Sequence, residues 1–106
     1  MIITPLNKVV GCAIEGVSLN DVSGNELEQI HDAWLKCGVV VIKGQHLTPL
    51  EQLIFAKYFG VPDVYPFLIG LDGYPEITRV LKTPSETENF GGVWHTDTIY
   101  LERPPM

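Results

Sequence analysis

Residues 23–42 have the sequence SGNELEQIHDAWLKCGVVVI, and this stretch predicts a helix followed directly by a strand. Ser23 and Glu26 have the spacing of a capping box, in which each side chain satisfies a free backbone N–H at the start of a helix. Apolar side chains then recur every three or four residues, and Gly38 follows as a helix stop. The apolar positions are Leu27, Ile30, Trp34 and Cys37. The four β-branched residues at 39–42 predict a strand that is central in its sheet and covered on both faces.

A second helix follows this strand, and another strand precedes the first helix. Thr48 and Glu51 repeat the capping-box spacing, and Pro49 occupies the first position of the helix that they start. Upstream, residues 9–19 mix apolar and small side chains and predict a strand that enters a turn. The residues expected to form the buried face of the second helix are Leu50, Leu53, Ile54 and Tyr58.

The second half of the chain has fewer regular segments. Residues 62–74 carry prolines and glycines among large apolar side chains and predict an ordered loop. Residues 76–81 and 94–101 predict strands, and the polar residues 82–92 predict a loop between them. The order of elements, with short helices early in the chain, favours an α+β fold over a doubly wound sheet. No repeat or low-complexity stretch divides residues 1–106, which are therefore predicted to form a single unit.

Composition and charge restrict the partners of the chain. Its 106 residues, 45% of them hydrophobic, are enough for one core. Thirteen acidic and seven basic residues give a net charge of −6, which argues against nucleic acid and anionic membranes as general partners. The longest apolar run, residues 38–42, is far too short to span a bilayer. Because the N-terminus also lacks the pattern of a signal peptide, the chain is expected to be cytoplasmic.

The sequence contains two cysteines, Cys12 and Cys37. They could pair in principle. Without a secretion signal, however, two reduced and buried thiols are the expected state, because disulfides are rare in the cytoplasm.

One pair of residues has the chemistry of a metal site. His95 and Asp97 are two positions apart, so on a strand both side chains project from the same face. An imidazole and a carboxylate are two of the three ligands in the 2-His-1-carboxylate triad, which binds Fe(II) and leaves positions open for substrate and O₂. The spacing alone also fits an exposed histidine beside an aspartate that accepts backbone N–H bonds. A hydrolytic or zinc-binding protein, in which the spacing is fortuitous or serves a different metal, is a more remote alternative.

The sequence around this pair resembles a known family. Residues 94–100, WHTDTIY, together with ERPP at 102–105, resemble the metal-binding signature of the taurine dioxygenase (TauD/TfdA) family. Further matches follow the family's order along the rest of the chain. They are ITPL at 3–6, GVVVIK at 38–43, LTP at 47–49 and FG at 59–60. The resemblance therefore covers essentially the whole chain.

The resemblance implies an oxidoreductase, an Fe(II)- and 2-oxoglutarate-dependent dioxygenase in which His95 and Asp97 bind the iron. It also implies a double-stranded β-helix (jelly-roll, clavaminate synthase-like) fold, of which this chain holds the N-terminal part as two short helices packed on an incomplete sheet. In the family, the second histidine ligand and the arginine that binds 2-oxoglutarate lie beyond the position of Met106. The chain is therefore expected to be an N-terminal fragment that is inactive in isolation, since His31 and His46 have no reason to approach His95.

The substrate implied by the resemblance is a small organic molecule. It would be anionic if Arg79 and Lys82 meet it, although two such cations also commonly face solvent. In taurine-using members, a His and a Tyr after the second helix and an Asn before the metal histidine contact the sulfonate. The matching positions here are Tyr65, Leu68 and Gly91, so taurine itself is not the expected substrate. Tyr65 is the candidate pocket residue, and a core position is the alternative for this aromatic side chain.

The incomplete sheet has a further implication. A jelly roll closes from about eight strands, and this chain supplies about half of them. Open strand edges are therefore expected to pair with another copy, which predicts a homo-oligomer. The alternative function is a non-catalytic assembly or binding module that oligomerises through these edges.

Overall fold

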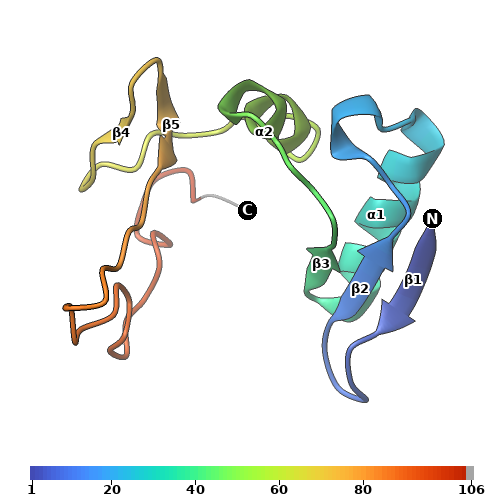
Figure 1. The fold of residues 1–106 in the computed structure, drawn as a ribbon, viewed down its shortest axis with the longest axis horizontal. Helices are drawn as coiled ribbons and strands as arrows, with labels where there is room; N and C mark the ends of the chain where they lie inside the picture. Colours follow the sequence, from blue (N-terminus) through green and yellow to red (C-terminus); the bar gives the residue numbers. More distant parts are fainter. Residues whose placement is uncertain (105–106) are drawn as a thin grey trace. The chain divides into compact units, whose positions relative to one another are not determined.

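The computed structural model describes residues 1–104. The chain forms two compact units, an N-terminal unit, Met1–Tyr58, and a C-terminal unit that begins at Phe59. The elements of both units are labelled in Figure 1. Two helices and two open sheets make the chain an α+β structure. Within the described residues, no helix has both the length and the apolar character needed to cross a membrane.

The N-terminal unit contains a three-stranded mixed sheet in the order β1-β2-β3. Strand β1 (Ile2–Pro5) is antiparallel to β2 (Cys12–Glu15), and β2 is parallel to β3 (Val40–Ile42). The expectation that the strand at 39–42 is central is therefore wrong, because β2 occupies the middle and β3 an edge. Val41 is consequently 44% exposed. The β-branched run reflects packing of β3 against a helix on one side rather than cover on both.

Strand β2 is shorter than the segment 9–19 predicted from the sequence. Gly11 and Gly16 both adopt positive φ, at 91° and 72°, and bound the strand on either side. Strand β1 was not predicted. Its four residues are exposed and end in a proline, so they lack the alternation that marks a half-buried strand.

Helix α1 (Gly24–Cys37) has the boundaries that its capping box predicts. The Ser23 N–H donates to Glu26 Oε2 at 2.9 Å, and the Glu26 N–H donates to Ser23 Oγ at 3.3 Å. The helix ends at Gly38, whose φ of 73° reverses the chain direction while its N–H donates to the Trp34 carbonyl. Ile30 on the inner face is buried, and α1 packs on both β2 and β3.

Helix α2 (Pro49–Ala56) also begins at its predicted capping box, between Thr48 and Glu51. Its predicted buried face is wrong, because no residue of α2 is buried. The residues expected on that face are half-buried or exposed: Leu50, Leu53, Ile54 and Tyr58. Among the described elements of the N-terminal unit, α2 packs on the short 3₁₀ helix η1 (Leu19–Asp21), and one small turn cannot cover an amphipathic helix.

Among residues 1–104, the buried hydrophobic core lies entirely in the N-terminal unit. It is formed by β2, the turn after it and the inner face of α1. The buried hydrophobic residues are Cys12, Ala13, Ile14, Val17, Leu19, Ile30 and Ala33. The core is thus built where the predicted helix meets the central strand.

The C-terminal unit contains one antiparallel hairpin, β4 (Gly70–Leu71) and β5 (Tyr74–Thr78), joined by a turn in which Gly73 has a φ of 76°. The strand predicted at 76–81 therefore begins two residues earlier and ends at Thr78, and β4 lies inside the predicted loop. The strand predicted at 94–101 is wrong, because residues 94–97 have no regular structure and residues 98–101 form a bend and a turn. A strand needs a partner for its ladder, and in the described part of this unit β4 and β5 pair only with each other.

Candidate functional site

His95 and Asp97 lie next to each other in the C-terminal unit, although no strand holds them. His95 Nε2 is 3.4 Å from Asp97 Oδ1. The chain bends directly after this pair, because the Ile99 N–H donates to the Asp97 carbonyl at 2.7 Å. The two side chains thus approach each other without the strand pleat to which the sequence interpretation attributed their shared orientation.

A second contact fixes the His95 ring. Nδ1 lies 2.7 Å from the backbone carbonyl oxygen of Val93. A carbonyl can only accept a hydrogen bond, so the ring donates from Nδ1. In neutral imidazole, Nε2 then carries the lone pair, and Nε2 is the atom closest to the Asp97 carboxylate. The Val93 carbonyl thus selects the tautomer in which Nε2 is free to bind a cation.

The surroundings of the pair are open to solvent. The His95 side chain is 51% exposed and that of Asp97 is 88% exposed. Residues 91–95 line a shallow concavity beside the imidazole. Gly91, with a φ of 70°, borders the ring so closely that a Cβ there would lie 3.4 Å from His95 Cε1. A small ligand therefore has access to Nε2 from this side.

The other histidines lie in the N-terminal unit. His31 makes an edge-to-face contact with Trp34 on α1, with ring centroids 6.1 Å apart, and His46 is exposed after β3. Across residues 1–104, no group of three His, Cys, Asp or Glu side chains is placed to hold a metal ion. The described chain therefore offers the His95–Asp97 pair as its donor set.

The candidate substrate residues also lie in the C-terminal unit. Tyr65 is half-buried and packs edge-to-face on Phe67, with centroids 5.6 Å apart. Arg79 is exposed just after β5, and Lys82 Nζ donates to Asn89 Oδ1. Tyr65 is thus held by an aromatic contact, and its role in substrate binding stays a prediction.

One polar contact in the C-terminal unit repeats the residue spacing of the two helix capping boxes. Thr83 and Glu86 have capping-box spacing, and the Thr83 N–H and hydroxyl both donate to Glu86 Oε2. These hydrogen bonds lower the pKa of the Glu86 carboxyl below its ordinary value of 4.5, because they stabilise its charged form. The T-x-x-E spacing of residues 83–86 could have predicted this contact from the sequence. Here the contact closes a turn and no helix follows.

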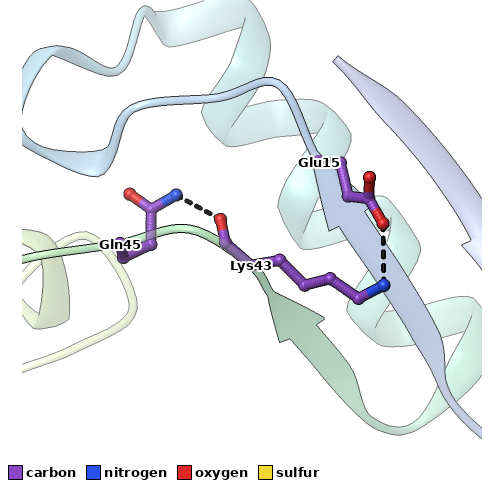
Figure 2. Close-up of polar contacts among 3 residues, drawn as sticks. All are labelled: Glu15, Lys43 and Gln45. Atoms are coloured by element: carbon purple, nitrogen blue, oxygen red, sulfur yellow. Dashed lines mark hydrogen bonds and ion pairs between the residues drawn. The ribbon is translucent and has the colours of Figure 1, made fainter.

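Sequence reasoning missed a second polar cluster, which lies in the N-terminal unit. Figure 2 shows the Lys43 ammonium paired with Glu15 and the Gln45 amide donating to the Lys43 carbonyl. Lys43 Nζ lies 2.7 Å from Glu15 Oε1. Gln45 also donates to the Val17 carbonyl at 2.8 Å and accepts from the Leu19 N–H at 3.0 Å. No local pattern could reveal Gln45, because two of its partners lie more than twenty residues earlier in the chain.

The sequence of the chain is similar to that of known proteins. The family model described as taurine catabolism dioxygenase TauD, TfdA family matches residues 3–106. An alkylsulfatase from Acinetobacter baylyi is 32% identical over 91% of this chain and 30% of its own length. An (S)-phenoxypropionate/alpha-ketoglutarate-dioxygenase from Delftia acidovorans is 29% identical over 93% of this chain and 37% of its own length.

A solved structure agrees with these relatives. It is that of a protein assigned as an alpha-ketoglutarate-dependent taurine dioxygenase from Burkholderia xenovorans. It superposes with a TM-score of 0.66 at 31% identity, over 78% of this chain and 32% of the other. The chain spans about a third of the length of these relatives. The match over nearly all residues, including the segment that carries His95 and Asp97, shows that the chain belongs to the TauD/TfdA dioxygenase family.

Proposed function

We propose that this chain is the N-terminal part of an Fe(II)- and 2-oxoglutarate-dependent dioxygenase, and that His95 and Asp97 are two of its iron ligands. The observation that carries the proposal is the convergence of His95 Nε2 and Asp97 Oδ1 within the family-matched segment. Imidazole nitrogen and carboxylate oxygen are the donors of the facial triad of such oxygenases.

The residues present fit a bound metal. Two donors at about 2.1 Å from one ion and at right angles to each other lie about 3 Å apart. The observed separation of 3.4 Å needs only a small adjustment to reach that value. Histidines that bind metals commonly donate their other ring N–H to a carbonyl or carboxylate, which fixes the ring. The Val93 carbonyl is such a partner for His95.

Bound Fe(II) with 2-oxoglutarate would supply the oxidising power for hydroxylation of a substrate C–H bond. The chain's own contribution is positional and electrostatic. His95 donates through a neutral nitrogen and Asp97 brings a single negative charge, so the pair can accept a cosubstrate that is itself a dianion. The low combined charge of the pair therefore suits 2-oxoglutarate.

We propose a small anionic organic substrate for the complete enzyme. The names of the relatives support this class, because an alkyl sulfate, a phenoxypropionate and taurine all carry an anionic group. Arg79 is exposed in the unit that holds the candidate metal ligands and is a candidate partner for such a group. Tyr65 is the candidate pocket residue. Leu68 and Gly91 stand where taurine-using members carry polar side chains, which argues for an anion other than taurine.

Several properties of the complete protein belong to the same proposal. The sheet β1-β2-β3 would be part of a double-stranded β-helix, and residues 1–106 would belong to one such domain. Because β1 and β3 are edge strands, we further propose that the isolated chain forms a homo-oligomer in the cytoplasm. A monomeric mass in dilute solution, measured by light scattering, would refute the oligomer.

Metal binding by His95 and Asp97 is tested by titrating the chain anaerobically with Fe(II) while recording amide NMR spectra. Paramagnetic Fe(II) broadens signals of nearby residues, so broadening is expected to centre on residues 93–97. His95→Ala should weaken binding at least about tenfold, whereas His46→Ala, which alters an exposed histidine of the other unit, should not change it. Broadening centred elsewhere, or unaffected by His95→Ala, would contradict the proposal.

The cosubstrate is tested in the same samples. Added 2-oxoglutarate should produce a weak visible charge-transfer band only if the ion keeps open positions beside His95 and Asp97. No succinate should form, because the family's second histidine ligand and its 2-oxoglutarate-binding arginine match no residue of 1–106. Turnover by the isolated chain would disprove its predicted inactivity.

A further inference from the structure

Cys12 and Cys37 meet where helix α1 joins the sheet. Cys12 is the first residue of β2 and Cys37 is the last residue of α1. The backbone ties these ends together, because the Gly11 N–H donates to the Cys37 carbonyl and the Cys12 N–H donates to the Val39 carbonyl, both at 2.9 Å. The two cysteines, far apart in sequence, are therefore neighbours in the core of the N-terminal unit.

The two thiols differ in accessibility. Both are free, as the sequence analysis expected. Cys12 is only 1% exposed, but Cys37 is half-buried rather than buried, so Cys37 is the more accessible of the two residues. Burial, and then the neighbouring Cys37 thiol, raise the pKa of Cys12 above its ordinary value. The effect of Cys37 on the pKa of Cys12 agrees with the proximity that the backbone hydrogen bonds of Gly11 and Cys12 establish.

We propose that Cys12 and Cys37 form a reversible disulfide that responds to the redox state of the surroundings. The oxidant is a low-molecular-weight disulfide of the glutathione class. This inference is independent of the proposed enzymatic function, because it uses neither the metal ligands nor the unit that holds them. Disulfides of cytoplasmic proteins are usually transient and redox-sensing, which agrees with free thiols in the reduced structure.

The reaction begins at the more accessible cysteine. The Cys37 thiolate attacks the small disulfide, forms a mixed disulfide and releases one small thiolate. The Cys12 thiolate then attacks the Cys37 sulfur, forms the Cys12–Cys37 bond and releases the second small thiolate. Two protein thiols are oxidised, one small disulfide is reduced to two thiols, and the two protons pass to the released thiolates.

The bond would link the end of α1 to the start of β2. It would close a loop that contains β2, η1 and nearly all of α1, which are the elements that build the core. A cross-link of this kind stabilises a fold mainly by restricting the unfolded chain. The oxidised form is therefore expected to unfold at a higher temperature than the reduced form.

The proposal is tested by incubating the chain with oxidised glutathione and measuring its intact mass. The expected product has lost two hydrogens, regains them after treatment with a dithiol, and shows a raised thermal midpoint by circular dichroism. A glutathione adduct that persists on Cys37 would overturn the proposal, as would failure of the native chain to react.

Two variants separate the steps. Cys12→Ala keeps the more accessible cysteine and is expected to stop at the glutathione adduct. Cys37→Ser is expected to remain unmodified, because Cys12 is inaccessible in the folded chain. If Cys12→Ala is poorly folded, Cys37→Ser still decides the question, since loss of two hydrogens or rapid glutathione addition in that variant would refute the proposed order.

Discussion

The geometry of Gly91 makes this single residue important for the candidate metal site. Its φ of 70° is one that side chains other than glycine rarely adopt, and a Cβ would lie in contact with the His95 ring. A substitution there would strain the backbone, while its Cβ would meet the His95 ring at an ordinary van der Waals distance. The backbone conformation just before His95 therefore favours glycine at position 91.

Gly91→Ala is expected to weaken Fe(II) binding and to destabilise the local turn by about 1 kcal/mol or more. The matched control is Gly60→Ala, because Gly60 has an ordinary φ and nothing lies within 4 Å of its added Cβ. Metal titration of both variants by amide NMR checks this prediction. Equal iron affinity in the two variants would show that Gly91 does not position His95.

Gln45 is the second single residue on which the stability of the structure is expected to depend. Its amide bridges Val17, Leu19 and Lys43 through three hydrogen bonds (Figure 2 shows the one to Lys43). Gln45→Ala leaves two partly buried backbone groups, at Val17 and Leu19, and the exposed Lys43 carbonyl without these partners, so a loss of about 2 kcal/mol in unfolding free energy is expected.

Lys43→Ala is the natural comparison, because it removes the ion pair with Glu15 and retains the Lys43 carbonyl. Both side chains of that pair are about half exposed, at 54% and 51%. The expected loss is therefore only about 0.3 kcal/mol. Urea unfolding of the two variants checks the difference, and a similar loss in both would contradict the bridging role of Gln45.

At the scale of elements, the two helices depend on reciprocal capping. The hydroxyl of Ser23 and the carboxylate of Glu26 satisfy each other's backbone N–H groups at the start of α1. Ser23→Ala is expected to cost about 1 kcal/mol of stability. The matched control is Ser18→Ala, since the Ser18 side chain makes no capping bond at η1. Thermal unfolding followed by circular dichroism measures both.

The capping carboxylates also give stability a pH dependence. Hydrogen bonds from Ser23 and Thr48 lower the pKa of Glu26 and Glu51 below the ordinary 4.5. The unfolded chain therefore binds more protons than the folded chain in this range. Stability is expected to be complete above pH 4.5 and to fall as the pH decreases further through the lowered pKa values.

The double variant Glu26→Gln, Glu51→Gln should flatten this decline. Glu28→Gln, on the exposed face of α1, serves as the control for removing a carboxylate. Urea midpoints between pH 3 and 7 report the effect. An unchanged acid dependence in the double variant would show that other carboxyls dominate.

The starts of both helices and the end of α1 were predictable from the sequence because their signals are local, whereas α2 ends at Ala56, before the Tyr58 expected on its buried face. Capping at Ser23 and Thr48 and the stop at Gly38 act within one turn, so neighbouring residues decide them. Strands were less predictable, because the role of β3 depends on which segments pair beside it. The same reason explains why residues 94–101 are not a strand: a favourable composition cannot replace a hydrogen-bonding partner.

The candidate site followed a similar pattern. The identities of His95 and Asp97 were accessible from their spacing and from the family resemblance. Their local geometry was not, because no strand holds the pair and the contact of the His95 ring with the Val93 carbonyl has no sequence signature. The prediction of a buried face on α2 was wrong, because periodicity shows which side of a helix is apolar but not what covers that side.

At the scale of the whole molecule, the buried core lies in one of the two units. All fully buried hydrophobic residues of the described chain belong to Met1–Tyr58. Stability follows buried apolar area, so this unit is expected to be the more protected one. Hydrogen exchange should show the slowest amides in β2 and α1 and faster exchange throughout residues 59–104. Equal protection in both units would contradict this expectation.

The position of the core at the start of the chain also matters during translation. Ribosomes add about 5–20 residues per second, and domains generally fold as they emerge. Small mixed α/β units fold in about milliseconds. The sheet and α1 can therefore be complete while the segment that carries His95 and Asp97 is still being synthesised, so the stable half of the chain is in place before its candidate metal ligands leave the ribosome.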